Sequence, residues 1–379
     1  MCIALLTTAH PKYALIVLNN RDEFILRPTS QPHWWTIPDT SDSETPAATI
    51  TPATNQTPAA NGDSPSNDHN DKKVQHVLSS RDLYRPERGT WMGITKAGHF
   101  AVLTNYRELD SSTGAPSVSG TKSRGSMVTA WLGNSTEQSV ADFVEGMIAD
   151  GSTQGVGGFS LLCGKLRRRR QPQGLGKEVD CDELEPLAIV SNKAVKPDQI
   201  PWVCESRDEV IGLSNAAYDH PDEWPKVTKG KALLKEEIKK AVAEDATQED
   251  LLSRLFGLLD QDDLPRHPNW TLEDYLKVLQ QSIFVPLLGD QQHKDDMAAW
   301  TARSKEDGHV SGNGTGQQGP PQPVSFSTGL YGTQRQTVIL VDWDGNVTYA
   351  ERSLSDADGK EIEKGKGDSV FRFAIEGWH

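Results

Sequence analysis

Short apolar runs separated by polar turns recur along most of the chain. Nine of them, rich in Val, Ile, Leu and aromatic residues, have the length of β-strands: CIALLTT, YALIVLNN, HFAVLTNY, GFSLLCG, PLAIVSN, EVIGLSN, TVILVDW, VTYAERS and FRFAIEG. The four residues AHPK join the first two runs at hairpin length, and Asp344-Gly345 favours a tight turn late in the chain. The pattern predicts about nine or ten strands that pair mainly antiparallel.

Other segments carry apolar residues at helical spacing. A capping box from Ser135 to Gln138 precedes one such stripe, which is predicted to end at Gly151. Three further helices are predicted over residues 229–242, 248–259 and 272–281. Strands, a helix, more strands and then consecutive helices indicate an α+β fold in which helices cover antiparallel sheets.

Three segments interrupt this alternation. Residues from about 38 to 72 and from about 304 to 325 are rich in small polar residues and proline, so they bury too little apolar surface to offset the entropy of ordering. We predict that both are disordered insertions. Residues from about 166 to 180 are predicted to form an extended loop, and the whole of residues 1–379 is interpreted as a single domain.

Composition narrows the function classes. The net charge of −14 provides no basic surface for nucleic acid, and no apolar run approaches the roughly 20 residues of a membrane span. Histidines show no metal-ligand spacing, and the cysteines are too few for a disulfide framework or a zinc site; they stand at positions 2, 163, 181 and 204. These features favour an intracellular protein without a transmembrane segment and without nucleic acid as a partner.

The first candidate for chemistry is Cys2. If Met1 is removed, Cys2 combines a nucleophilic thiol with a free α-amine, whose reference pKa of about 7.7 to 8.0 suits a general base. The alternative is a small buried thiol in a strand, which is what most free cysteines are.

A second polar cluster, NNRDEF, ends the strand that should return beside Cys2. In an extended strand, alternate side chains share a face, so Asn20 lies with Asp22 and Arg21 lies with Glu23. Only one pair can face the thiol unless the strand is broken there. The alternative is a solvated strand end that leads into a loop.

Further motifs accompany these two in a fixed order. They are RP at 27–28, GTWMGI at 89–94, AVLTNYRE at 101–108, SRG at 123–125, GGFSLL at 157–162, GLSNA at 212–216, WPKV at 224–227 and YGTQRQTVILVD at 331–342. Together they resemble the NRDE-domain family named for transport and Golgi organisation protein 2. The resemblance spans the chain apart from the insertions, and these long insertions suggest a fungal-type member.

The resemblance implies a four-layer αββα sandwich like that of N-terminal-nucleophile hydrolases, similar to the choloylglycine hydrolase and acyltransferase branch. It implies Cys2 as nucleophile, Arg21 and Asp22 as positioning groups, and amide donors for an oxyanion from Asn105 and Asn215. The remaining expected site residues, with binding roles, are Asn20, Glu23 and Arg335. Arg21 and Asp22 are adjacent, however, so their side chains should diverge, and asparagines at strand ends often satisfy turn backbone instead.

The function implied by the resemblance is Golgi organisation, protein secretion and intracellular trafficking of lipid or haem, with Cys2 at the centre of the site. The alternative is an active cysteine-dependent amidase, thioesterase or acyltransferase acting on a small acylated metabolite. No cofactor is required, and haem enters only as a transported ligand. The expected location is the cytoplasm, with peripheral membrane, Golgi or mitochondrial association.

Overall fold

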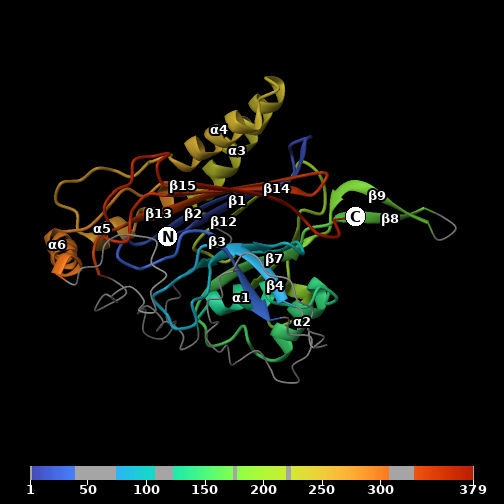
Figure 1. Cartoon of the computed structure of the whole chain (residues 1–379), viewed down its shortest axis with the longest axis horizontal. Helices are drawn as coiled ribbons and strands as arrows, with labels where there is room; N and C mark the ends of the chain where they lie inside the picture. Colours follow the sequence, from blue (N-terminus) through green and yellow to red (C-terminus); the bar gives the residue numbers. More distant parts are fainter. Residues whose placement is uncertain are drawn as a thin grey trace, which may run out of the picture.

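The computed structural model describes residues 2–38, 74–106, 123–173, 177–218, 223–306 and 328–378. Two antiparallel sheets dominate it (Figure 1). The strands of the six-stranded sheet, in order of pairing, are β12 (Val210–Leu213), β1 (Ile3–Thr7), β2 (Tyr13–Phe24), β13 (Tyr331–Asp342), β14 (Asn346–Ser353) and β15 (Asp368–Ala374). Those of the seven-stranded sheet are β11 (Trp202–Val203), β10 (Leu187–Ser191), β7 (Phe159–Lys165), β6 (His99–Asn105), β5 (Met92–Thr95), β4 (Val74–Ser79) and β3 (His33–Pro38).

Helices cover the outer face of each sheet. The described helices are α1 (Gly125–Leu132), α2 (Val140–Ala149), α3 (Pro225–Ala243), α4 (Gln248–Leu259), α5 (Leu272–Leu276) and α6 (Gln291–Glu306), with short 3₁₀ turns η2 (Pro197–Gln199) and η3 (Leu279–Gln281). Figure 1 shows α3 and α4 on one side of the two sheets and α1 and α2 on the other. The predicted four-layer αββα sandwich is therefore confirmed.

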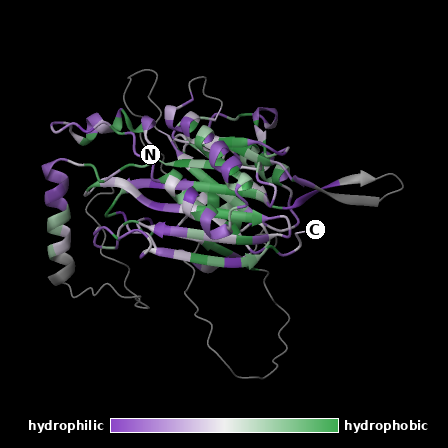
Figure 2. Cartoon of the chain, turned by 90° about the horizontal axis from the view of Figure 1, so that it is seen from above, coloured by the Kyte–Doolittle hydropathy of each residue, from purple (hydrophilic) through white to green (hydrophobic). Residues whose placement is uncertain are grey.

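The alternation of side chains along β2 explains why both faces of this sheet are apolar. Leu15 and Val17 pack between the two sheets, whereas Ile16 and Leu18 pack against α3 and α4. A strand that is buried on both faces reads as a continuous apolar run, as residues 14–18 do. Figure 2 shows the same concentration of hydrophobic positions in the strands.

The predicted helices agree with the structure to different extents. The helix over 248–259 is confirmed as α4, but α3 begins four residues earlier than predicted, at Pro225. The predicted helix over 272–281 divides into α5 and η3, and the predictions did not include α1 and α6.

The predicted capping box at Ser135 is wrong. The cap of α2 is Ser139, whose Oγ accepts a hydrogen bond of 3.0 Å from the backbone N of Asp142. Ser135 instead closes the preceding turn by accepting from the backbone N of Glu137 at 3.2 Å. The helix does end beside Gly151, which has φ of +70°.

The extended loop predicted over 166–180 is also wrong, because this segment begins a β-hairpin of β8 (Arg168–Gln173) and β9 (Lys177–Leu184). Cross-strand ion pairs stabilise its base, with Arg168 at 2.8 Å from Asp182 and Arg169 at 3.2 Å from Glu183. The hairpin projects away from the sandwich in both views (Figures 1 and 2).

The two predicted insertions lie almost wholly outside the described residues, which resume at 74 and 328. Only the last residue of β3, Pro38, and the end of α6 reach into them. None of the described helices has an apolar stretch long enough to cross a membrane.

Candidate functional site

A pocket of about 460 Å³ lies where β1 begins and where β2 and β6 end. Its lining comes from both sheets, from the N-terminus of α1 and from the segment between α5 and η3. The residues that matter for its chemistry are Cys2, Arg21, Asp22, Glu23, Arg27, Asp82, Arg85, Trp91, Asn105, Tyr106, Arg124, Asn215, Trp224, Lys277 and Tyr331. A second pocket, at the end of β12, has a volume of about 30 Å³.

Cys2 enters the pocket directly ahead of β1. Its carbonyl accepts a 2.7 Å hydrogen bond from Ser214 Oγ, which ties the start of the chain to the end of β12. Its Sγ lies 3.9 Å from the carbonyl oxygen of Asp22. Burial raises the pKa of the Cys2 thiol, and the nearby chain amine and the Arg21 guanidinium act in the opposite direction. Burial therefore disfavours the thiolate form of Cys2 in the resting site.

Arg21 and Glu23 share the face of β2 that looks toward the other sheet, as the alternation predicts. The Arg21 guanidinium donates to the side-chain oxygen of Gln334 and lies 4.5 Å from the centroid of the Trp91 ring. Glu23 Oε2 is 4.0 Å from Arg21 and 3.1 Å from Arg27. Both Arg21 and Glu23 line the pocket.

Asp22 points to the opposite face but still lines the pocket, because β2 ends there. Its Oδ1 accepts a 2.7 Å hydrogen bond from Thr333 Oγ1, and its carbonyl accepts one of 3.2 Å from Tyr331 Oη. Adjacent to it is Lys226, which is fully buried. Burial lowers the pKa of Lys226, and the nearby Asp22 and Cys2 oppose that shift.

Asn105 and Asn215 meet across the two sheets. The side-chain amide of Asn215, just after β12, donates to the carbonyl of Asn105, at the end of β6. The amide carries a second N–H, which remains for another acceptor. Asn105 Oδ1 is buried and has no hydrogen-bond partner among the described residues. An N–H group on a bound molecule would fill that gap.

Asn20 lies outside the pocket, which corrects its expected binding role. Its Nδ2 donates to the carbonyls of Leu259 and Ile283 at 2.8 and 2.9 Å on the helix-covered face. Because alternate residues of β2 share a face, Asn20 follows Ile16 and Leu18 toward the helices. Its role in the described structure is to hold the end of α4.

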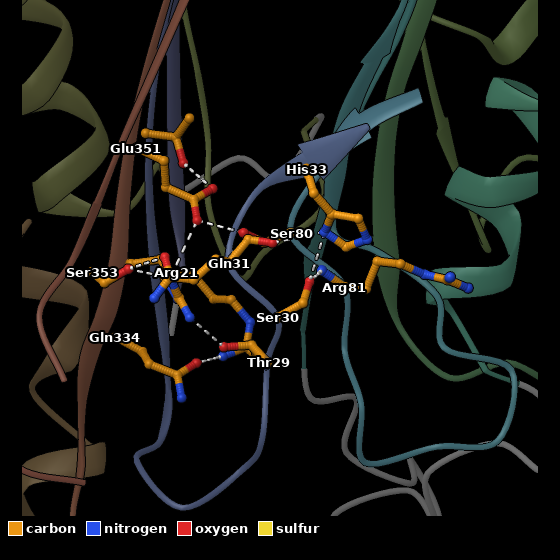
Figure 3. Close-up of polar contacts among 12 residues, drawn as sticks. Arg21, Thr29, Ser30, Gln31, His33, Ser80, Arg81, Gln334, Glu351 and Ser353 are labelled. Atoms are coloured by element: carbon orange, nitrogen blue, oxygen red, sulfur yellow. Dashed lines mark hydrogen bonds and ion pairs between the residues drawn. The ribbon is translucent and has the colours of Figure 1, made fainter. Parts of the chain in front are cut away.

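Arg335 also lies outside the pocket lining. Its guanidinium approaches Glu351 at 3.5 Å and donates to Thr29 Oγ1 at 3.0 Å and to Gln31 Oε1 at 3.1 Å. Glu351 in turn accepts a 2.5 Å hydrogen bond from Ser80, on the other sheet. This polar network joins the sheets, as Figure 3 shows for Glu351 and Ser80, so Arg335 makes a structural contact and not the expected binding contact.

The pocket lining is cationic although the chain is acidic. Five lining side chains are Arg or Lys and three are carboxylates. Burial opposes the charge of Arg27, but Glu23 and Asp82 outweigh it and raise its pKa. Arg85 and Arg124, in contrast, have no carboxylate partner among the described residues. Within the described parts of the chain, the Arg124 guanidinium donates only to the carbonyl of Gly158, at 3.1 Å. These two guanidiniums can receive an anionic group of a ligand.

The described residues contain no group of His, Cys, Asp or Glu side chains that could hold a metal ion. The fold and the pocket together define an αββα sandwich protein with a cavity that Cys2 and residues of both sheets line. Sequence comparison gives the family. The sequence pattern of the Transport and Golgi organisation 2 family matches residues 1–43 and 64–356, and the chain belongs to that family. The unmatched residues 44–63 fall inside the first predicted insertion.

Named relatives match over nearly the whole chain. The human Transport and Golgi organization protein 2 homolog is 24% identical over 347 residues, covering 91% of this chain and 88% of that protein. The bovine homolog is 25% identical over 353 residues with the same coverage. An uncharacterized protein of Saccharomyces cerevisiae is 25% identical over 403 residues, covering 99% of this chain and all of the yeast protein.

Among solved structures, two variant forms of conjugated bile acid hydrolase from Clostridium perfringens align with the chain. Their identities are 10% and 9%, with TM-scores of 0.33 and 0.35. The alignments cover 99% of this chain and 92% and 98% of the hydrolase chains. Scores this low support no inference about the pocket.

Proposed function

We propose that the pocket binds a small acylated compound with its acyl carbonyl at Cys2, and that the protein serves intracellular lipid trafficking in support of Golgi organisation and secretion. The observation that carries the proposal is the convergence of Cys2, Arg21 and Asn105 from two sheets on one cavity. Residues of the lining offer a thiol, guanidiniums and amide groups, which suit a polar acyl headgroup. The proposed site of action is the cytoplasm, with association at the Golgi or mitochondria.

The unpaired guanidiniums predict the charge of the ligand. Arg85→Gln should weaken binding of an anionic acyl probe about tenfold, because a hydrogen bond to a charged group is lost. cis-Parinaric acid, followed by its fluorescence, is a suitable anionic probe, and its methyl ester is the neutral counterpart. The ester should bind parent and variant alike.

Arg88→Gln is the matched control for this prediction. Arg88 lies three residues from Arg85, is exposed, and is not part of the lining. Equal effects of the two substitutions on the acid would show that the charge of the surface, and not the pocket, attracts the probe.

The second candidate is catalysis, which the placement of a thiol in the pocket favours. Cys2 Sγ would attack the acyl carbonyl, the C–N or C–S bond would break, and the leaving amine or thiol would take the thiol proton by way of the α-amine. Water would then release the carboxylic acid and restore the thiol. The second N–H of Asn215 would face the developing oxyanion.

This candidate requires the α-amine of Cys2 to be free. We expect intact-mass measurement of protein purified from its own cells to show the loss of Met1. Once Met1 is lost, the α-amine of Cys2 can accept the proton of the thiol in the same residue. This base compensates for the burial, which raises the pKa of the thiol. A mature chain that retains Met1 would rule out this form of catalysis and leave the binding function.

We also propose haem as a second ligand that the pocket could carry. The described lining holds one thiol and three tyrosines, and no histidine is among these residues. Cys2 and the tyrosines would therefore be the only axial ligands from this lining. The absorbance of bound haem is the measurement. If neither Cys2→Ala nor competition by parinaric acid changes it, haem does not bind in this pocket.

A further inference from the structure

The pairing of β2 with β13 contains a β-bulge beside the pocket. Thr333 pairs with Asp22 and Arg335 pairs with Arg21, so Gln334 is an extra residue with no partner across the ladder. A bulge of this kind re-aims the side chains that flank it.

The bulge places two consecutive side chains on one face. Thr333 contacts Asp22 and the backbone N of Val285 on the helix-covered side of the sheet. Gln334 and Arg335 both point between the sheets, and Figure 3 shows Gln334 in that space. In a regular strand only one of the two would do so.

The Gln334 amide makes three contacts there. Its Nε2 donates to the carbonyls of Ile25 at 3.2 Å and Arg27 at 3.0 Å, and its Oε1 accepts from Arg21. The side chain is buried, with 4% of the residue exposed. A single amide therefore fixes a charged side chain of β2 and the turn that follows it.

The held guanidinium matters to Cys2. Arg21 and Cys2 line the same pocket, and a nearby positive charge favours the thiolate over the thiol. Without the Gln334 acceptor, Arg21 would keep only its contacts with the Trp91 ring and the more distant Glu23. The Arg21 guanidinium could then move away from the Cys2 thiol.

We propose that Gln334 is a positioning residue for the Cys2 site, which fixes Arg21 and the turn at 25–27 and thereby sets how readily Cys2 reacts. The inference rests on the proposed function in that Cys2 is the centre of the site. It adds a residue that is not part of the lining and acts through Arg21 and Arg27, which are.

The experiment measures alkylation of Cys2 by iodoacetamide against pH, read by mass spectrometry of the Cys2 peptide. Gln334→Leu should shift the midpoint of the rate upward by about 0.5 to 1 pH unit, part of the 1 to 3 units that a close opposite charge supplies. Gln334→Glu should shift it further, because its carboxylate pairs with Arg21 and adds a negative charge. The glutamate keeps the volume and the acceptor for Arg21 but loses the two N–H donors to the carbonyls of Ile25 and Arg27. It gives a second measurement of the Cys2 midpoint if the leucine variant does not fold.

Gln336→Leu is the matched control. Gln336 is fully buried two residues further along β13 but faces the helices, where its Nε2 donates to Asp260 at 3.0 Å. It should lose stability without moving the Cys2 midpoint. Equal midpoints for the Gln334 and Gln336 variants would overturn the proposal, as would a parent Cys2 that is not alkylated at any pH.

Alkylation requires no acyl ligand, so the two proposals fail separately. A midpoint that moves in a protein that binds no acyl probe would support the role of Gln334 and reject the proposed function. A protein that binds the probe, but whose Cys2 midpoint does not move in the Gln334 variants, would support the proposed function and reject the role of Gln334.

Discussion

Cys2→Ala is expected to abolish any cleavage of acyl compounds while parinaric acid binds within about threefold of the parent. Removal of the nucleophile should lower the rate by about 10³-fold or more, because every covalent step starts from its sulfur. Binding should persist because the guanidiniums and the amide groups of the pocket come from other residues. The assay combines a panel of acyl thioesters and N-acyl amides with intact-mass detection of an S-acyl adduct.

Cys2→Ser is the matched variant, because it keeps a hydroxyl nucleophile of similar size. It should bind like the parent and form any ester adduct far more slowly. A parent that neither turns over the panel nor forms an adduct, but binds the probe as tightly as Cys2→Ala does, would establish the carrier function. Loss of probe binding in Cys2→Ala would instead contradict our placement of the ligand, since the thiol itself would then hold it.

The second large effect concerns stability. Glu351→Ala should lower the free energy of unfolding by about 3 to 5 kcal/mol, because it leaves the buried charge of Arg335 without its ion-pair partner. Ser80 and Tyr349 also lose an acceptor, at 2.5 and 2.8 Å from Glu351. Urea denaturation followed by tryptophan fluorescence measures the change.

Two further variants serve as controls for Glu351→Ala. Glu363→Ala removes an exposed carboxylate paired only with Lys366 and should change the free energy by less than about 0.5 kcal/mol. The double variant Arg335→Met with Glu351→Leu should recover the part of the loss that comes from the unpaired charge of Arg335, since an apolar pair can replace a buried ion pair. If Glu351→Ala costs no more than Glu363→Ala, the network does not hold the sheets together.

Strand alternation predicted most of what β2 does. The pairs Asn20 with Asp22 and Arg21 with Glu23 follow from the period of an extended strand, and the contacts agree. We predicted that only one of the two pairs would face the site. Asn20 does lie outside the pocket, but Asp22 lines it together with Arg21 and Glu23. Asp22 reaches the pocket because it lies near the end of the strand, where the cavity extends past the sheet.

The sequence also contained a signal for Lys226 that the helix prediction did not use. Proline is favoured at the first position of a helix, so Pro225 marks the start of α3. With that start, Lys226 stands four residues before Gly230 and eight before Leu234, on the buried stripe. A lysine in phase with an apolar face is a candidate for a buried amine.

The bulge at Gln334 could not be predicted in the same way. Nothing in the run YGTQRQTVILVD interrupts the strand pattern, and the extra residue exists only relative to the partner strand. Gln334 points between the sheets because of a register shift that a single strand does not encode.

The pairing of β3 with β4 has a practical consequence. The chain leaves β3 at Pro38 and returns at Val74, and these two residues pair directly across the ladder. Both ends of the intervening segment are thus fixed by the sheet, and the entropy of closing a loop grows only with the logarithm of its length. Replacing residues 44–63, which the family pattern leaves unmatched, with a fluorophore-bearing or affinity sequence would therefore give a handle on the protein without altering the strands around Cys2.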